Sequence, residues 1–339
     1  MERNAANLVK RRRKMKTVAR IAALLGAFAL VAGTIGNGYA QAYPSRSIRV
    51  IIPFSPGGST DTITRPLAQK LTAALGQGVV IDNRPGAGGN IGMDLVAKSA
   101  PDGYTLLMAA GSIAINPSLY KKMPFDVVKD LDPIILVCVV TQLTVVHPSL
   151  PVKSVKELIA LAKSRPGELN FASAGAGTST HLAGELFQSM AKINMVHIPY
   201  KGSGAAMPAL LGGQVSLMFA NMPGTIQHVQ AGRLRLLAVN TEKRSPLLPN
   251  VPTVSESGIR GFESSTFFGL LAPAGTPKDI ISRMNSEVDR ALKAADTQER
   301  MATEGAVPMG GSPEQFASHL KAQIEKWGKV VRDSGARLE

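Results

Sequence analysis

Short strand-like runs alternate with helical patterns along almost the whole chain after Tyr43. Ile48–Phe54 is the first strand-like run, Thr60–Leu75 is the helical pattern that follows it, and the alternation continues as far as Phe267–Ala272. Strands that alternate with helices predict parallel sheets with helices on both faces. Sheets of this kind bind ligands outside the carboxyl ends of their strands, so a binding site is expected there.

Two strand-like runs do not fit the regular pattern. Ile134–Val146 is too long for an ordinary strand, and Phe267–Ala272 leads directly into the turn sequence PAGTP. Both runs are predicted to cross between two lobes. Lobe one then comprises residues 43–145 and 266–339, and lobe two comprises residues 146–265.

The C-terminus is expected to be all helix, because Lys278–Lys293 and Pro313–Arg332 both show helical periodicity. The single cysteine, Cys138, lies in an apolar run and is expected to be a buried small hydrophobe. It excludes an intramolecular disulfide, so stability has to come from a large apolar core. A chain of 339 residues can bury such a core and usually divides it between domains.

Residues 1–42 have the pattern of a secretory signal peptide. The basic residues Lys10–Lys14 precede the apolar run Ile21–Gly33, and Ala40–Ala42 has the small-residue pattern of a cleavage site. Cleavage there would release Tyr43 as the first residue. The apolar run is shorter than the roughly 20 residues that a transmembrane helix needs, which favours a signal peptide over an uncleaved anchor.

This leader contains a second possible start. Met15 begins a complete signal peptide, so residues 1–14 are interpreted as an over-extended start. The leader also carries eight lysines and arginines against one glutamate, which is about half of the net charge of +14. The other basic residues are scattered and do not cluster with aromatic residues, which argues against nucleic-acid binding.

Two glycine-rich turns each join a strand to a helix. In PFSPGGSTD the turn at Gly57-Gly58 is followed by a Ser-Thr-Asp helix start, and NFASAGAGTSTHL has the same design around Gly175 and Gly177. A helix N-terminus presents unsatisfied N–H groups and the positive end of the helix dipole. Either turn alone is a common structural feature. One such turn in each lobe predicts an anion site between the lobes.

Other kinds of site find little support. RPGAGGNIG lacks the spacing of a dinucleotide loop, and no Walker lysine follows a glycine-rich loop. Ser59, Ser112 and Ser173 are candidate nucleophiles with His181 or His197 as a base, but no nucleophile-elbow motif is present. The five histidines lack zinc-ligand spacing. No cofactor and no metal are therefore expected.

A set of motifs follows in a characteristic order along the chain. These are RVIIPFSPGGSTD, VIDNRPGAGGNIG, APDGYTLLMA, HIPYKGSGAAMPALLGGQVSLMFAN, NVPTVSESG and FGLLAPAGTP. The set resembles the Bug (TctC-like) receptors, the periplasmic solute-binding proteins of tripartite tricarboxylate transporters, from about Pro44 to the C-terminal helix. The resemblance implies an α/β, two-lobed type II periplasmic-binding-protein fold with mostly parallel sheets flanked by helices. It also implies a small carboxylate ligand held between the lobes, and a receptor rather than an enzyme.

The resemblance also implies which residues bind the ligand. Carried over position by position, the first-lobe loop consists of Ser55, Pro56, Gly57, Gly58, Ser59, Thr60 and Asp61. The second-lobe loop consists of Ser173, Gly175, Ala176, Gly177 and Thr178, together with His181. Ser112, Tyr200 and Asn221, which follow or end predicted strands, complete the expected site. The family often has an aspartate where this chain has Ala220, which puts a ligand with a cationic amine in doubt.

The expected function is capture of a small organic carboxylate in the periplasm and its delivery to the membrane permease subunits of a tripartite tricarboxylate-type transporter. A ligand-sensing periplasmic subunit of a signalling system is the first alternative. A secreted α/β hydrolase is the second, and it requires a base geometry that the sequence does not display.

A chain that starts at Met15 should be exported and should mature at Tyr43, because its leader has a basic region, an apolar run and a cleavage site. N-terminal sequencing of the periplasmic protein checks this. An exported protein that retains Met1 or Met15 would contradict the prediction.

Overall fold

The computed structural model describes residues 10–11, 14–18 and 43–334, and the chain divides into two units between Ser45 and Arg46. The fold is that of the second unit, from Arg46 onward. The apolar run and the cleavage site of the expected signal peptide lie outside the described residues. Among the helices of the described ranges, none combines the length and the apolar character that crossing a membrane requires.

Strands and helices alternate as the sequence predicts, with additional short elements. The strands are β1 (Ile48–Ile52), β2 (Val79–Asn83), β3 (Thr105–Ala110), β4 (Leu131–Val146), β5 (Asn170–Ser173), β6 (Val196–Pro199), β7 (Leu217–Asn221), β8 (Arg235–Val239), β9 (Ser265–Pro273) and β10 (Ala306–Gly310). The helices are α2 (Ser59–Leu75), η1 (Ala87–Gly89), α3 (Asn90–Ala97), α4 (Ser112–Leu119), α5 (Val155–Ser164), α6 (Ser179–Ala191), α7 (Ser203–Leu211), α8 (Ile226–Gln230), α9 (Lys278–Lys293), α10 (Ala295–Thr303) and α11 (Pro313–Ser334).

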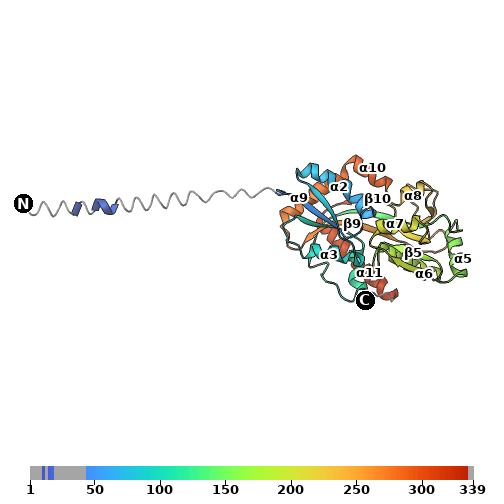
Figure 1. Cartoon of the computed structure of the whole chain (residues 1–339). Coiled ribbons are helices and arrows are strands. Elements are labelled where there is room, and N and C mark those ends of the chain that lie inside the picture. Colours follow the sequence, from blue (N-terminus) through green and yellow to red (C-terminus); the bar gives the residue numbers. More distant parts are fainter. Residues whose placement is uncertain (1–9, 12–13, 19–42, 335–339) are drawn as a thin grey trace, which may run out of the picture. The chain divides into compact units, whose positions relative to one another are not determined.

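The sheet contains two groups of strands, and the strands within each group are parallel. Two antiparallel strands lie between the groups. β1 lies between β2 and β3 and is parallel to both, and β5 lies in the same way between β6 and β7. β9 and β4 run antiparallel to their neighbours between these two groups. Helices α5, α6, α7 and α8 lie on the side of the β5 group, at the right in Figure 1, whereas α2, α3 and α9 lie on the opposite side. Each glycine-rich turn therefore follows the middle strand of a parallel group.

Strand β4 pairs with strands on both sides of the sheet's centre. Its residues from Leu131 to Thr141 pair with β9, and those from Gln142 to Val146 pair with β7. β10 pairs with the first part of β4, and β8 pairs with the second part. Lobe one is used below for β1–β3, β9, β10 and their helices, and lobe two for β5–β8 and theirs. The lobe boundaries near residues 145 and 265 stay a prediction.

Each lobe has its own apolar core. In lobe one Phe316 of α11 packs with strand residues such as Leu107 and Leu271. In lobe two Phe171 and Phe219 pack edge to face, with ring centroids 6.1 Å apart, within a larger aromatic cluster. Cys138 of β4 is fully buried, as expected, and burial raises the pKa of its thiol to about 12.

The expectation of an all-helical C-terminus is wrong at β10. Ala306 is buried whereas Val307 and Met309 are exposed, which is the period-two pattern of a strand with one covered face. β10 pairs only with β4 among the described strands, and an edge position tolerates Pro308. A five-residue strand with a proline and a terminal glycine gives a weak signal in a sequence, so it was missed.

Gly184 provides a test of the packing of α6 on the sheet. A Cβ atom at this position would overlap the ring of Phe171 on β5. Gly184→Ala should therefore lower the free energy of unfolding by about 1–3 kcal/mol, as overpacked cores do. Urea denaturation measures the difference, and a loss below about 0.5 kcal/mol would mean that the ring moves aside at little cost.

Candidate ligand-binding site

The glycine-rich turn after β1 leaves the first turn of α2 with free N–H groups. Gly57 has a φ of 75°, a conformation that favours glycine, and Gly58 precedes the helix with no side-chain cap. The hydrogen bonds of the helix begin with Thr62, whose N–H donates to Gly58 O at 2.9 Å. The N–H groups of Ser59 and Thr60 consequently have no acceptor within the helix.

The turn after β5 has the same consequence for α6. Gly175 and Gly177 have φ values of 132° and 81°, and Thr178 caps the helix. Leu182 N–H donates to Thr178 O at 3.0 Å, so the earlier N–H groups of Ser179 and Thr180 lack an intrahelical acceptor. The two lobes therefore present the same feature, a helix start with unused donors.

Both helix starts line one cavity of about 20 Å³. Its hydroxyl-bearing residues are Ser55, Ser59, Thr60, Ser112, Thr178, Ser179, Thr180 and Ser203. The other lining residues are Phe54, Gly58, Asp61, Ala110, Ala174 and Asn221. A space of this size holds about one water molecule, so the cleft is closed in this structure.

The two helix starts are connected by a buried amide network. Gln142 is fully buried on β4, and its Nε2 donates to Ser179 Oγ at 3.1 Å and to Asn221 Oδ1 at 2.9 Å. Asn221 Nδ2 in turn donates to Ser59 Oγ at 2.9 Å. Ser264 Oγ donates to Gln142 Oε1 and completes the bonding of that amide. The network links the first residue of α2 to the first residue of α6.

Asp61 is the charged residue of the cavity lining, and its carboxylate is engaged within lobe one. Oδ2 accepts from Arg65 Nε at 2.7 Å and from Gly57 N–H at 3.0 Å, and Oδ1 accepts from Asn83 Nδ2 at 3.2 Å. Burial alone would raise the pKa of Asp61, but the hydrogen bonds from Arg65, Gly57 and Asn83 outweigh it and lower the pKa. The carboxylate is therefore ionised and paired, and it holds the Gly57 turn.

Ser112 provides a polar group without a partner. Its side chain begins α4, lines the cavity and is 1% exposed, and its Oγ has no hydrogen-bond partner among the described residues. Buried hydroxyl groups in proteins are nearly always hydrogen-bonded to protein or water. The Ser112 hydroxyl can therefore bond to a water molecule or to another polar group that enters the cavity.

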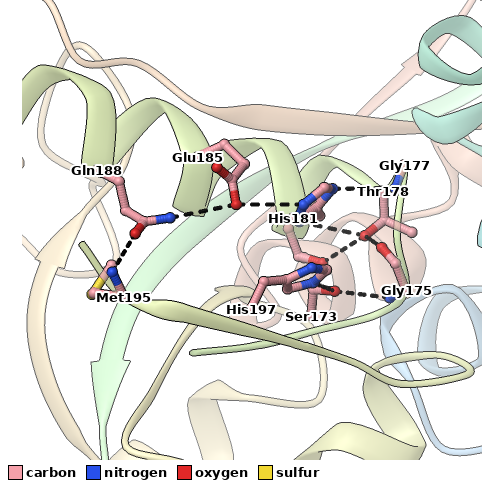
Figure 2. A network of polar contacts seen from close by, with 10 residues as sticks. Ser173, Gly175, Gly177, Thr178, His181, Glu185, Gln188, Met195 and His197 are labelled. Atoms are coloured by element: carbon pink, nitrogen blue, oxygen red, sulfur yellow. Dashed lines mark hydrogen bonds and ion pairs between the residues drawn. The ribbon is translucent and has the colours of Figure 1, made fainter. Parts of the chain in front are cut away.

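Ser173 and His197 hold one side of the β5–α6 turn, as Figure 2 shows. Gly175 N–H donates to Ser173 Oγ at 3.1 Å, and this oxygen lies 2.6 Å from His197 Nε2. The hydroxyl proton has no other acceptor in the described part of the chain, so Ser173 donates to His197. Ser173 is fully buried, which leaves no access for a substrate.

His181 holds the other side of the same turn. Its Nδ1 accepts from Gly177 N–H at 3.3 Å, and its Nε2 lies 3.5 Å from a carboxylate oxygen of Glu185 (Figure 2). The ring stacks on His197 with centroids 3.9 Å apart. Both nitrogens of His181 are thus engaged inside lobe two. The histidine shapes the turn and does not face the cavity.

A larger cavity lies next to the inner one. It has a volume of about 230 Å³, and Phe54 and Ala174 line both spaces. Its walls come from the η1 loop of lobe one and from residues such as Tyr200 of lobe two. A Cβ atom at Gly88 of η1 would overlap the carbonyl oxygen of Ala176.

The two lobes meet through their backbones beside the inner cavity. Ser55 N–H donates to the carbonyl oxygen of Lys201 at 2.9 Å. A Cβ atom at Gly204 would overlap the carbonyl oxygen of Pro56, so this contact requires glycine. Glycine thus allows the main chains of the two lobes to approach closely where the cleft closes.

Comparison with known proteins shows which family has this architecture. A family model described as TctC, Tripartite tricarboxylate transporter family receptor, matches residues 63–336. The chain belongs to this family. It is 44% identical to protein BugT of Bordetella pertussis, over 94% of this chain and 99% of that protein. TctC-family members are solute-binding receptors rather than enzymes, so the hydrolase alternative is wrong.

Solved structures of similar TctC-type proteins have the same fold. R. palustris Rpa4515 with adipate is 38% identical, with a TM-score of 0.85 over 87% of this chain and 100% of that chain. Periplasmic binding protein BugD is 35% identical, with a TM-score of 0.85 over 88% and 100%. MatC from Rhodopseudomonas palustris with bound malate is 31% identical, with a TM-score of 0.80 over 85% and 100%. The two-lobed periplasmic-binding-protein fold is therefore confirmed.

The structure of this TctC-family chain brings together about half of the residues expected to bind the ligand. Those that line the inner cavity are Ser55, Gly58, Ser59, Thr60, Asp61, Ser112, Thr178 and Asn221. Those that line the larger cavity are Gly175, Ala176 and Tyr200. Those that line neither are Pro56, Gly57, Ser173, Gly177 and His181. Several of this last group hold the turns, and the ligand-binding role of the whole set stays a prediction.

Sequence reasoning missed part of the site of this TctC-family chain. The missed lining residues are Phe54, Ala110, Ala174, Ser179, Thr180 and Ser203. Gln142 was also missed, although a glutamine within a long apolar run is a signal that could have identified it. Ala220 packs in the apolar core of lobe two, because alternate strand residues face opposite ways and Asn221 faces the cavity. The missing carboxylate at Ala220 therefore says nothing about the ligand.

Acid should destabilise the protein through His197. Burial is the main cause that lowers the pKa of His197 from 6.5 to about 3, and an electrostatic contribution from nearby His181 adds to it. The folded state keeps the ring neutral while the unfolded chain takes up a proton, so the free energy of unfolding should fall as pH falls from 6.5 toward 3. His197→Gln should reduce this slope. One titrating group changes it by at most about 1.4 kcal/mol per pH unit, and the change should be smaller here because the ring is only partly buried.

Urea unfolding at pH 7, 6 and 5 measures the slope of each protein. His147→Gln is the control, since it removes a histidine outside the network of Figure 2. Equal slopes for the original protein and His197→Gln would contradict the assignment.

Proposed function

We propose that this chain is a periplasmic receptor that captures a small organic carboxylate and delivers it to the permease subunits of a tripartite tricarboxylate-type transporter. The observation that carries the proposal is the pair of helix starts, α2 and α6, that line one hydroxyl-rich cavity. The hydroxyl of Ser112 on the same wall has no partner among the described residues and can bond to such a ligand.

The electrostatics of the cavity suit an anion. The N-terminus of each helix is equivalent to roughly half a positive charge, so two of them together balance about one carboxylate. The free N–H groups of Ser59, Thr60, Ser179 and Thr180 and the surrounding hydroxyls can donate to its oxygens. No lysine or arginine is among the described residues of the lining. The carboxylate is therefore held by dipoles and hydrogen bonds.

Ligand entry requires the cleft to open. The inner cavity of about 20 Å³ is enclosed by residues of both lobes, so a ligand can reach the two helix starts only when the lobes move apart. Asn221 Nδ2 with Ser59 Oγ and Ser55 N–H with Lys201 O are contacts between the lobes that opening would break. β4, which pairs with strands of both lobes, and the start of β9, where the chain returns from lobe two, form the hinge.

The relatives and the family support the ligand class and the partner. Adipate and malate, which are named in the structures of two relatives, are both small carboxylates. The family description names receptors of tripartite tricarboxylate transporters, which supports delivery to such a transporter. A receptor of this kind works outside the cytoplasm, in agreement with the signal peptide expected at residues 1–42.

A thermal-shift screen of the mature chain against mono-, di- and tricarboxylates tests the function. At least one carboxylate should raise the melting temperature, and calorimetry should show that its primary amide binds about ten- to a hundredfold more weakly, because the charge that the helix dipoles favour is lost. Ser112→Ala should weaken binding of the acid by about tenfold or more. Ser189→Ala, an exposed serine on the same α6 helix that bears the site, is the matched control.

Two results would contradict the proposed function. One is the absence of stabilisation by every carboxylate in the screen. The other is equal affinity for an acid and its amide, which would mean that the helix starts do not contribute to binding through the charge of the ligand.

A further inference from the structure

A third cavity lies in lobe one between helices α2 and α10, which are neighbours in Figure 1. Its volume is about 330 Å³, against about 20 and 230 Å³ for the two cavities between the lobes. Its described walls come from α2, between Thr62 and Ala73, and from α10, between Asp296 and Met301. A cavity of this size can enclose a small organic molecule. Because both helices belong to lobe one, this α2–α10 cavity does not depend on closure of the cleft.

Part of the lining of the α2–α10 cavity is apolar. Ile63 and Leu67 lie four residues apart, on one face of α2, and Met301 of α10 lines the same space. Each of these side chains is at most 4% exposed. An apolar chain or ring that contacts them would leave water, which favours binding.

Thr297 adds a buried hydroxyl to this lining. The residue is 8% exposed, and its Oγ1 has no hydrogen-bond partner among the described residues. Buried hydroxyl groups in proteins are nearly always hydrogen-bonded to protein or water. The Thr297 hydroxyl can therefore bond to water or to a polar atom of a molecule in the cavity.

The charged residues of the lining leave one positive charge in excess. Lys70, Asp296 and Arg300 are the ionisable residues among the described ones, two basic side chains against one acid. Lys70 Nζ donates to both carboxylate oxygens of Asp296, at 2.8 and 2.6 Å, so these two charges are paired. The exposed guanidinium of Arg300 has no hydrogen bond or ion pair within the described part of the chain. A guanidinium in this state suits an acid group, to which it can donate two parallel hydrogen bonds.

We propose that the α2–α10 cavity is a second ligand site, which binds a small amphipathic anion, that is, an acid group attached to an apolar chain or ring. Arg300 pairs with the acid group, and Ile63, Leu67 and Met301 contact the apolar part. The site is separate from the cleft between the lobes and takes its lining from lobe one. Its ligand therefore does not compete with the carboxylate of the proposed function.

Fluorescence titration with anilinonaphthalenesulfonate tests this site. The dye joins aromatic rings to a sulfonate, and its emission rises when it leaves water. It should bind the mature chain saturably, and octanoate, which has an acid group on an apolar chain, should displace it. A dicarboxylate that stabilises the protein in the thermal-shift screen should leave the dye bound, because it occupies the cleft.

Ala73→Trp tests the place of binding. Ala73 is exposed at the wall of the cavity, so a large side chain there should occupy part of the space and weaken dye binding at least tenfold. Ala74→Trp is the matched control, since it puts the same side chain at the next exposed residue of α2, which does not line the cavity. The control should bind the dye as the original protein does.

Arg300→Gln tests the role of charge. Loss of the guanidinium should weaken dye binding about two- to fivefold, the range of an exposed ion pair, and should make the remaining binding less sensitive to salt. Arg260→Gln is the control, because Arg260 is an exposed arginine of lobe two that does not line the cavity.

Four results would overturn the inference. These are the absence of saturable dye binding, equal binding by the original protein and Ala73→Trp, failure of octanoate to displace the dye, and displacement of the dye by a dicarboxylate that binds in the cleft. The last result would leave the proposed function intact. If no carboxylate stabilises the protein in the screen, the proposed function fails, whereas the dye titrations and the variants still decide whether the second site exists.

Discussion

The side-chain amide of Gln142 connects the two halves of the cleft. It lies on β4 at the residue where this strand changes its partner from β9 to β7. It bonds to Ser179 at the start of α6 and, through Asn221, to Ser59 at the start of α2. An unpaired buried amide is costly, so the network favours one spacing of the two helix starts. The geometry of the closed cavity depends on this spacing.

The described lining of the inner cavity contains no lysine or arginine. Arg65 is paired with Asp61, and this pair stabilises the Gly57 turn. In the proposed function, the attraction for an anion would come instead from the main chain of two helices, whose dipoles are fixed when the protein folds. Dipoles that are already oriented need little reorganisation when a ligand arrives. Burial of a free lysine would cost more free energy than burial of these neutral groups.

The sequence predicted the fold and the two turns well, because both depend on local patterns. Apolar periodicity located the strands, and glycine followed by Ser or Thr located the starts of α2 and α6. The roles of individual residues were harder to predict. Gly175 and Gly177 were expected to present N–H groups to a ligand, yet Ser173 and His181 accept from them. Gln142 reaches the site only through long-range sheet pairing. Such contacts depend on tertiary structure, which periodicity does not encode.

The approach of the lobes at glycine has a consequence for how such receptors diverge. At Gly58, Gly88 and Gly204 the lobes come together through main-chain atoms, and a side chain at Gly88 or Gly204 would collide with the opposite lobe. Some lining hydroxyls, such as that of Ser112, take no part in these glycine contacts or in the hydrogen bonds between the lobes. Evolution can therefore exchange such residues for others while the contacts between the lobes stay the same. The glycines at which the lobes meet are then distinct from the residues that select the ligand. This allows one ancestral receptor to give rise to descendants that recognise different solutes.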